Sequence, residues 1–224
     1  MKNKAFRLLT AATIIIGAVN LLVSVFYIIG LPEKVPLHYN AAGVCDGYGS
    51  KWFTLFFPLI ILLINPIGLF ITSKSKSLEK NMKPLVISIL FIEFYLIAME
   101  WVLLITMKSE TKLGDKMSLN VSLIVPAIIS ILFIAMGNYM PTIRQNKHLG
   151  VKLPWTLKNE RCWDVTHRFT GKVWVAAGIL TLSFLTVIKL IGVDNPTVFI
   201  ILTLVPISLA IIIPTIYSYN HRND

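Results

Sequence analysis

Six long apolar runs dominate the chain, and each is long enough to cross a lipid bilayer as a helix. A spanning helix needs about 20 apolar residues, because each residue advances roughly 1.5 Å along the axis. The runs do not alternate apolar and polar residues, as the strands of a lipid-facing barrel would. The pattern therefore predicts an all-α integral membrane protein with six transmembrane helices, near residues 8–30, 52–72, 84–107, 119–138, 171–192 and 196–217.

The longer of two polar segments, residues 139–170, carries most of the side-chain chemistry. It contains a glycine turn, a proline and then a helix start, for which Thr156 is the expected N-cap. We expect residues 157–169 to form one interfacial helix in this loop. Its tryptophans Trp155 and Trp163, with Phe169, would then enter the headgroup zone, and its basic side chains would face phosphates. The helix either anchors the bundle only or also forms a docking surface for a cytoplasmic partner.

The shorter polar segment, residues 31–51, contains two prolines and three glycines, which exclude a long helix. We expect its "VPLHYN" stretch to be extended. His38 and Asn40 would share one face of an extended strand. Asn40 and Asp46 would equally well close turns through backbone N–H groups. Two interpretations therefore stay open for these side chains: a structural turn, or a ligand-binding loop.

Charge sets the expected orientation. The formal net charge is +10, although only 14% of the residues are charged. With the N-terminus inside, 15 of the 21 lysines and arginines fall in inner segments and 6 in outer ones, as positive-inside topology requires. We therefore expect both termini in the cytoplasm and an uncleaved first helix. The basic residues would then meet membrane lipid, and no direct nucleic-acid partner is expected.

The chain divides into two halves of three helices each. Residues 1–107 would form an N-terminal half with the outer loop 31–51, and residues 108–224 a C-terminal half with the inner loop 139–170. An odd number of helices per half would place the halves in inverted orientation, as in many transporters. The similarity between the two loops is faint, so an inverted repeat stays one alternative.

Two acidic residues fall inside an apolar run. Glu93 and Glu100 are seven residues apart, so they lie on one helix face, about 10 Å apart along the axis. An ionisable group at this depth usually faces a cavity or polar partners; for Glu93 these would be Asn20, Asn65 or Asn138. Structural hydrogen bonding and proton or ligand handling both fit. The second interpretation would make the chain a small proton-coupled transporter or exporter.

No motif of a soluble enzyme is present: the sequence has no Gly-x-Ser-x-Gly, phosphate loop or His-Glu-x-x-His. We therefore expect neither catalysis nor a cofactor. The spacing of Cys162 and His167 does not match known zinc sites, so no metal is expected. Cys45 and Cys162 fall on opposite sides of the membrane in the expected topology and would not pair.

Residues 137–178 resemble the signature region of the SdpI-type immunity proteins. That pattern runs from Gly-Asn through Pro-Trp-Thr-Leu to Thr-His-Arg, with Lys152 at a position where arginine is common. Residues 35–52 resemble a small membrane domain of unknown function that often precedes it. The matching positions are Pro36, His38, Asn40, Gly43, Asp46 and Lys51, and then Gly137, Asn138, Asn146, Gly150, Val151, Lys152, Pro154, Trp155, Thr156, Leu157, Trp163, Thr166, His167 and Arg168.

The resemblance implies a multi-pass protein of a bacterial cell membrane that protects its host from a secreted killing peptide. It also implies, for some members, that a cytoplasmic autorepressor is held at the membrane. Under this hypothesis His38, Asn40 and Asp46 would face the toxin. The inner loop would meet the repressor through Asn146, Gly150, Lys152, Pro154, Trp155, Thr156, Trp163, His167 and Arg168.

Overall fold

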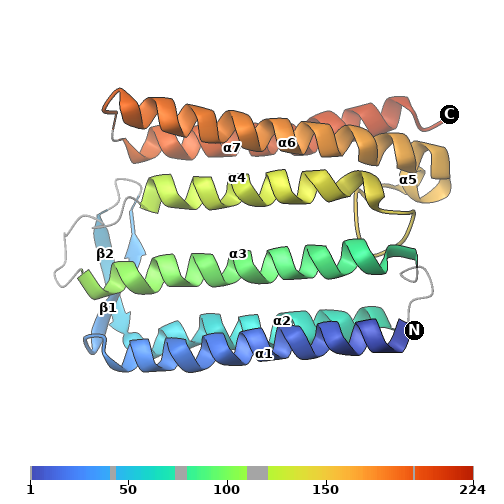
Figure 1. The fold of residues 1–224 in the computed structure, drawn as a ribbon. Helices are drawn as coiled ribbons and strands as arrows, with labels where there is room; N and C mark the ends of the chain where they lie inside the picture. The colour runs from blue at the N-terminus through green and yellow to red at the C-terminus, as the bar shows by residue number, and fades with distance from the viewer. Residues whose placement is uncertain (1, 41–43, 74–79, 110–120, 194, 224) are drawn as a thin grey trace.

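Six long helices form the body of the protein (Figure 1). The computed structural model describes the chain except residues 1, 41–43, 74–79, 110–120, 194 and 224. The lengths and compositions of the helices suit six membrane crossings, between 18 and 31 residues long. The predicted all-α membrane fold is therefore confirmed. The helices are α1 (Lys2–Ile29), α2 (Phe56–Ser73), α3 (Met82–Ser109), α4 (Val121–Tyr139), α6 (Glu160–Leu190) and α7 (Pro196–Asn220).

Shorter elements close the two ends of the bundle. The antiparallel strands β1 (Lys34–Tyr39) and β2 (Cys45–Ser50) form a hairpin, and η1 (Lys51–Leu55) leads from it into α2. Within the described residues, the termini, η3 (Met140–Thr142) and α5 (Pro154–Lys158) lie at the opposite end (Figure 1). We call these the hairpin end and the loop end. The extended "VPLHYN" stretch is confirmed, whereas the partner strand was not predicted.

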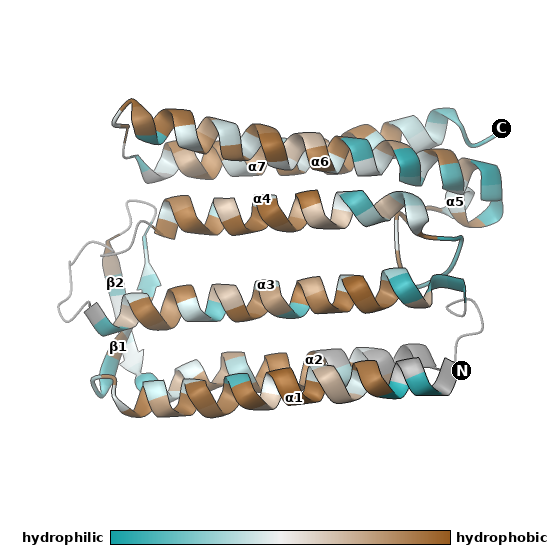
Figure 2. Cartoon of the chain, in the orientation of Figure 1, coloured by the Kyte–Doolittle hydropathy of each residue, from teal (hydrophilic) through white to brown (hydrophobic). Residues whose placement is uncertain are grey.

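The long helices are mostly hydrophobic along their length, and hydrophilic residues gather toward their ends (Figure 2). Many of the exposed side chains of these helices are apolar, and several polar side chains are buried between them. Phe26 is 75% exposed and Leu190 80% exposed, whereas Glu93 is fully buried. This distribution is the reverse of that in a soluble domain, where exposed apolar patches are small. It is the arrangement expected when lipid surrounds the bundle, because lipid has no means of solvating polar groups.

The helices pack as α1 with α2 and α3, and as α4 with α6 and α7, while α3 contacts α4 between them (Figure 1). Glycines allow the closest approach, between α4 and α6. A Cβ added to Gly137 would lie 2.9 Å from the Gly171 carbonyl oxygen, and one added to Gly178 would lie 2.6 Å from the Ser130 carbonyl oxygen. Small residues of this kind let membrane helices pack backbone to backbone.

The expected separate interfacial helix over residues 157–169 is wrong in one respect. The segment is helical, but from Glu160 onward it continues without a break into the transmembrane helix α6. The N-cap is Asn159, whose side-chain oxygen accepts from the Cys162 N–H, and not Thr156. Only α5, five residues long, lies in the loop itself. The helix continues because no proline or glycine interrupts residues 160–170.

Candidate functional site

The residues between η3 and α6 form a folded loop, which we call the signature loop (residues 143–159). Its first turn is built on Asn146, which is 3% exposed. The side-chain oxygen of Asn146 accepts from the backbone N–H groups of His148 (2.8 Å) and Leu149 (2.7 Å). Its amide nitrogen donates to the carbonyls of Arg144 (2.8 Å) and Leu149 (3.0 Å). All the hydrogen-bonding capacity of this amide is thus used to shape the turn.

His167 locks the next part of the loop onto α6. Its Nε2 accepts from the Val151 N–H at 3.0 Å, and its Nδ1 faces the Trp163 carbonyl at 2.8 Å. A backbone N–H only donates and a carbonyl only accepts, so the imidazole must be neutral with its proton on Nδ1. The ring also stacks on Trp163, with centroids 4.0 Å apart. His167 therefore acts as a structural latch.

Gly150 makes this latch possible. Its φ is +107°, a conformation that side chains strongly disfavour. A Cβ at this position would also lie 2.2 Å from Nε2 of His167. Trp163 is fully buried, and its Nε1 donates to the Ile143 carbonyl at the start of the loop at 2.7 Å. The expectation that Trp163 enters the headgroup zone is therefore wrong.

The second part of the signature loop is fixed by Thr156 and Trp155. The Thr156 hydroxyl accepts from the Leu153 N–H at 2.9 Å and donates to the Val151 carbonyl at 2.8 Å. Trp155 donates from Nε1 to Ser218 Oγ on α7 at 3.0 Å. Pro154 occupies the first turn of α5, where its missing N–H has no cost. The Thr156 bonds thus close the loop on itself, and the Trp155 bond ties it to α7.

Asn81 joins the signature loop to the other half of the molecule. It is fully buried just before α3. Its side-chain oxygen accepts from the Arg144 N–H at 2.7 Å, and its amide donates to the Arg144 carbonyl at 3.0 Å. Neither Asn81 nor Ser218 was predicted. Each is a polar residue at a helix end, which is common in any membrane protein, so the sequence carried no signal for it.

The signature loop and the first turns of α6 present positive charge outward. Lys152 and Arg168 are exposed, and only Lys152 makes a hydrogen bond, from Nζ to the His148 carbonyl at 3.2 Å, among the described residues. The predicted docking residues are thus of two kinds, mostly buried ones that shape the loop and the exposed Lys152 and Arg168, which lie among further exposed basic side chains. Asn146, Gly150, Thr156, Trp163 and His167 hold the loop together, whereas a set of basic side chains is free to meet a partner: Arg144, Lys147, Lys152, Lys158, Arg161, Arg168 and Lys172.

Within the described residues, no three histidine, cysteine or acidic side chains come close enough to hold a metal. Cys162 is fully buried, and its thiol points to the Ser218 carbonyl at 3.5 Å. Cys45 is also a buried free thiol, and it lies at the hairpin end (Figure 1). The two cysteines are therefore separated by the length of the bundle.

At the hairpin end, the structure brings two of the predicted side chains together. His38 Nδ1 contacts Asp46 Oδ1 across the strands, with the side chains 72% and 44% exposed. Asn40 closes the turn instead, accepting from the Val44 N–H at 3.1 Å. His38 and Asp46 thus form an accessible acid–base pair, and the turn interpretation applies to Asn40.

Lys51 holds the hairpin on the bundle. It is 6% exposed, and its Nζ donates to the carbonyls of Ile29 (3.1 Å) and Leu31 (3.0 Å) and pairs with Glu33 (3.1 Å). A cation at the end of α1 neutralises the negative end of the helix dipole. Next to it, Val35 is buried among Ile28, Leu31, Leu104 and Met107.

The intramembrane acids are both buried on α3. Glu100 accepts from Asn20 Nδ2 at 2.6 Å and from Ser24 Oγ at 2.7 Å, and Trp101 Nε1 donates to Asn20 Oδ1 at 3.0 Å. Asn20, one of the three partners considered for Glu93, donates to Glu100 instead. Asn138 donates to the Ile134 carbonyl of its own helix. The side chain of Asn65 lies outside the described residues.

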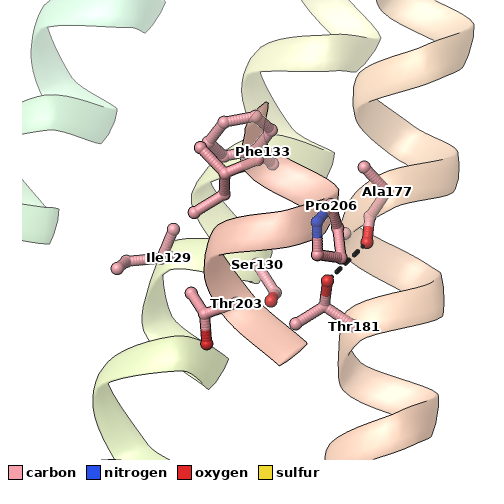
Figure 3. A pocket seen from close by; sticks show the side chains of 9 residues that line it. Ile129, Ser130, Phe133, Ala177, Thr181, Thr203 and Pro206 are labelled. Atoms are coloured by element: carbon pink, nitrogen blue, oxygen red, sulfur yellow. Dashed lines mark hydrogen bonds between the residues drawn. The ribbon is translucent and has the colours of Figure 1, made fainter. Parts of the chain in front are cut away.

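A small cavity lies between α4, α6 and α7 (Figure 3). Ser130, Thr181, Thr203 and Pro206 line it, with a volume of about 10 Å³. Each of the three hydroxyls donates to a carbonyl four residues earlier in its own helix. A cavity of this size holds about one water molecule. It is too small to be the binding site of a transported solute.

Comparison with known proteins identifies the architecture. Residues 142–218 match the SdpI/YfhL protein family, and residues 9–62 match a domain of unknown function, DUF1648. The chain is 30% identical over 212 residues to the Immunity protein SdpI of Bacillus subtilis (strain 168), covering 93% of each chain. No solved structure matches.

The first match includes the whole signature loop and the latch His167, and the second includes the hairpin and Lys51. Together with six helices able to cross a bilayer, these relationships make the protein a multi-pass protein of the cell membrane. The chain belongs to the SdpI/YfhL protein family.

Proposed function

We propose that this chain is a membrane immunity protein, which protects its host cell against a secreted antimicrobial peptide without catalysis. The observation that carries the proposal is the 30% identity to an immunity protein over 93% of both chains. A match of this length includes the signature loop, the hairpin and all six long helices. It therefore supports a shared task for the whole molecule.

The hairpin end is proposed to face outward and meet the toxin. His38 and Asp46 are accessible there. The aromatic residues Trp52, Phe53 and Phe56, which follow the hairpin in the chain, are 47%, 69% and 63% exposed. Aromatic side chains of this kind settle at the membrane–water interface, so they would hold the hairpin at the surface that an incoming peptide reaches first. Asn40 would shape this surface, and would not contact the toxin.

The loop end is proposed to face the cytoplasm, together with both termini. Its exposed basic side chains would then attract an acidic surface of a cytoplasmic repressor, with Lys152 and Arg168 in the contact. Asn146, Gly150, Pro154, Trp155, Thr156, Trp163 and His167 would act indirectly, by holding the loop in its shape. The halves 1–107 and 108–224 would supply the outer and inner surfaces respectively.

The test is protection of a sensitive bacterium that lacks its own immunity genes. Cells expressing the chain are challenged with a killing peptide of the type that this family resists, and survival is measured. His38→Ala and Asp46→Asn should reduce survival at unchanged membrane levels, whereas Lys34→Ala, an exposed change on the same hairpin, should not. Full sensitivity of cells with wild-type protein in the membrane would contradict the proposal.

A proton-coupled transporter is the competing function, and the burial of Glu93 and Glu100 on one face of α3 favours it. Proton-driven solute movement into vesicles, abolished by Glu93→Gln, would support the transporter. Protection that persists in Glu93→Gln would support immunity, because immunity by binding needs the loops and not an intramembrane acid.

A further inference from the structure

A groove runs along the surface where α4 and α6 meet, close to the loop end. It has a volume of about 460 Å³, within the range of roughly 300–1,000 Å³ typical of ligand clefts. Val175, Ala176 and Ile179 line its apolar part, and Ile179 is 51% exposed. Asn138, Pro141 and Lys172 line its polar end. The groove thus joins an apolar channel to a positively charged mouth.

The length of α6 places this mouth at the edge of the hydrocarbon layer. The helix has 31 residues, which at about 1.5 Å each give about 46 Å. The hydrocarbon core of a bilayer is only about 30 Å thick. Counted back from Leu190, about 20 residues fill that core, so the boundary falls next to Lys172. Residues 160–170 then continue α6 through the headgroup zone.

The polar groups at the mouth have unused hydrogen-bonding capacity. Lys172 is exposed and makes no hydrogen bond or ion pair with any described residue. The Asn138 side chain donates one N–H to the Ile134 carbonyl at 3.0 Å, and its oxygen accepts no hydrogen bond from a described residue. Arg168, one turn closer to the loop end on the same helix, adds a second exposed positive charge.

The floor of the groove is backbone. Gly137 and Gly171 bring α4 and α6 so close that a Cβ on Gly171 would lie 2.7 Å from the Gly137 carbonyl oxygen. Without side chains at these positions, the channel between the helices stays open to the surface beside Pro141 and Val175. An extended chain of methylene groups would fit along it toward Ile179.

We propose that this groove binds one anionic phospholipid. Its phosphate is held by Lys172 and Asn138 with support from Arg168, and one acyl chain lies over Val175, Ala176 and Ile179. The positive charge at the mouth of the groove and the position of this mouth at the edge of the hydrocarbon layer both favour an anionic phospholipid. Basic pockets between transmembrane helices bind anionic headgroups, and a soluble anion would leave the apolar channel unfilled. The inference does not depend on the proposed immunity function.

Native mass spectrometry of the full-length protein tests the proposal. The protein is reconstituted in nanodiscs of phosphatidylcholine, with or without phosphatidylglycerol, and the lipids that it retains on release are counted. Wild type should retain phosphatidylglycerol in preference. Lys172→Gln should weaken this retention about fivefold, the contribution of roughly one basic residue at an anionic surface. Lys158→Gln removes the same charge from an exposed side chain of α5, outside the groove, and should change the retention less than twofold.

Ala176→Phe provides an independent variant, because residue 176 is exposed and its side chain would fill the channel without entering the core. It should reduce retention of phosphatidylglycerol while Lys172 is intact. Equal losses in Lys172→Gln and Lys158→Gln would overturn the proposal in favour of diffuse attraction. Displacement of the lipid by excess inorganic phosphate would indicate an anion site only. A change of oligomeric state in Ala176→Phe, with lipid retention unchanged, would assign the groove to a second copy of the chain.

Discussion

Replacing Gly150 by alanine tests the latch that holds the signature loop. Two costs add at this position. A side chain at φ +107° is strained by roughly 1–2 kcal/mol. The new Cβ would also lie 2.2 Å from His167 Nε2, so the ring must leave the Val151 N–H. A buried donor without a partner costs about 1–3 kcal/mol. The sum predicts a local destabilisation of about 2–5 kcal/mol.

The buried thiol of Cys162 reports this opening directly. Cys162 is fully buried in the first turn of α6, beside the loop. In a Cys45→Ser background, its rate of labelling by a maleimide measures how often the loop end opens. Each 1.4 kcal/mol corresponds to about a tenfold change in an equilibrium. Gly150→Ala should therefore speed labelling by at least about 30-fold, if labelling follows the open population.

Two controls separate strain from contact. Gly192 also has a positive φ, +78°, but a Cβ there meets nothing within 4 Å. Gly192→Ala should therefore lower thermal stability by the strain alone and leave Cys162 labelling unchanged. In a His167→Ala background the imidazole is absent, so Gly150→Ala should add only its strain. Labelling of Gly150→Ala at the wild-type rate, or full additivity with His167→Ala, would refute the proposed latch.

Three further predictions concern the other polar contacts. Lys51→Met removes the donor to the Ile29 and Leu31 carbonyls and should lower stability by about 1–3 kcal/mol in thermal unfolding, whereas exposed Lys34→Met should change it little; equal effects would argue against a stabilising role of Lys51 at the end of α1. Glu100→Gln places an amide N–H against one of its two donors and should lower the unfolding midpoint while leaving protection intact; a stable but inactive variant would instead favour proton handling. Trp155→Phe and Ser218→Ala should each cost about 0.5–1.5 kcal/mol, and the double variant should cost no more than either alone; additive losses would mean that the two side chains act separately.

The sequence by itself determined the membrane fold. Apolar runs of about 20 residues have few stable alternatives in lipid, because the backbone must satisfy its own hydrogen bonds. The number of helices and most of their positions therefore follow from local composition. The extended stretch before Tyr39 and the burial of Glu93 and Glu100 followed from the same local information. The start of α6 did not: it lies at 160 and not 171, because the polar residues 160–170 are helical although they are not apolar.

Only the tertiary structure decided what the signature residues do. Composition marked Asn146, Trp163 and His167 as chemically rich, and a partner-binding role was predicted for them. Their hydrogen bonds instead go to backbone groups of the protein itself. Those of Asn146 stay within its own turn, whereas Trp163 reaches Ile143 and His167 reaches Val151. A polar side chain in a sequence carries no mark of whether its partner will be another molecule or its own backbone. That choice depends on which groups the fold buries without water, since each of these must find a partner inside the protein.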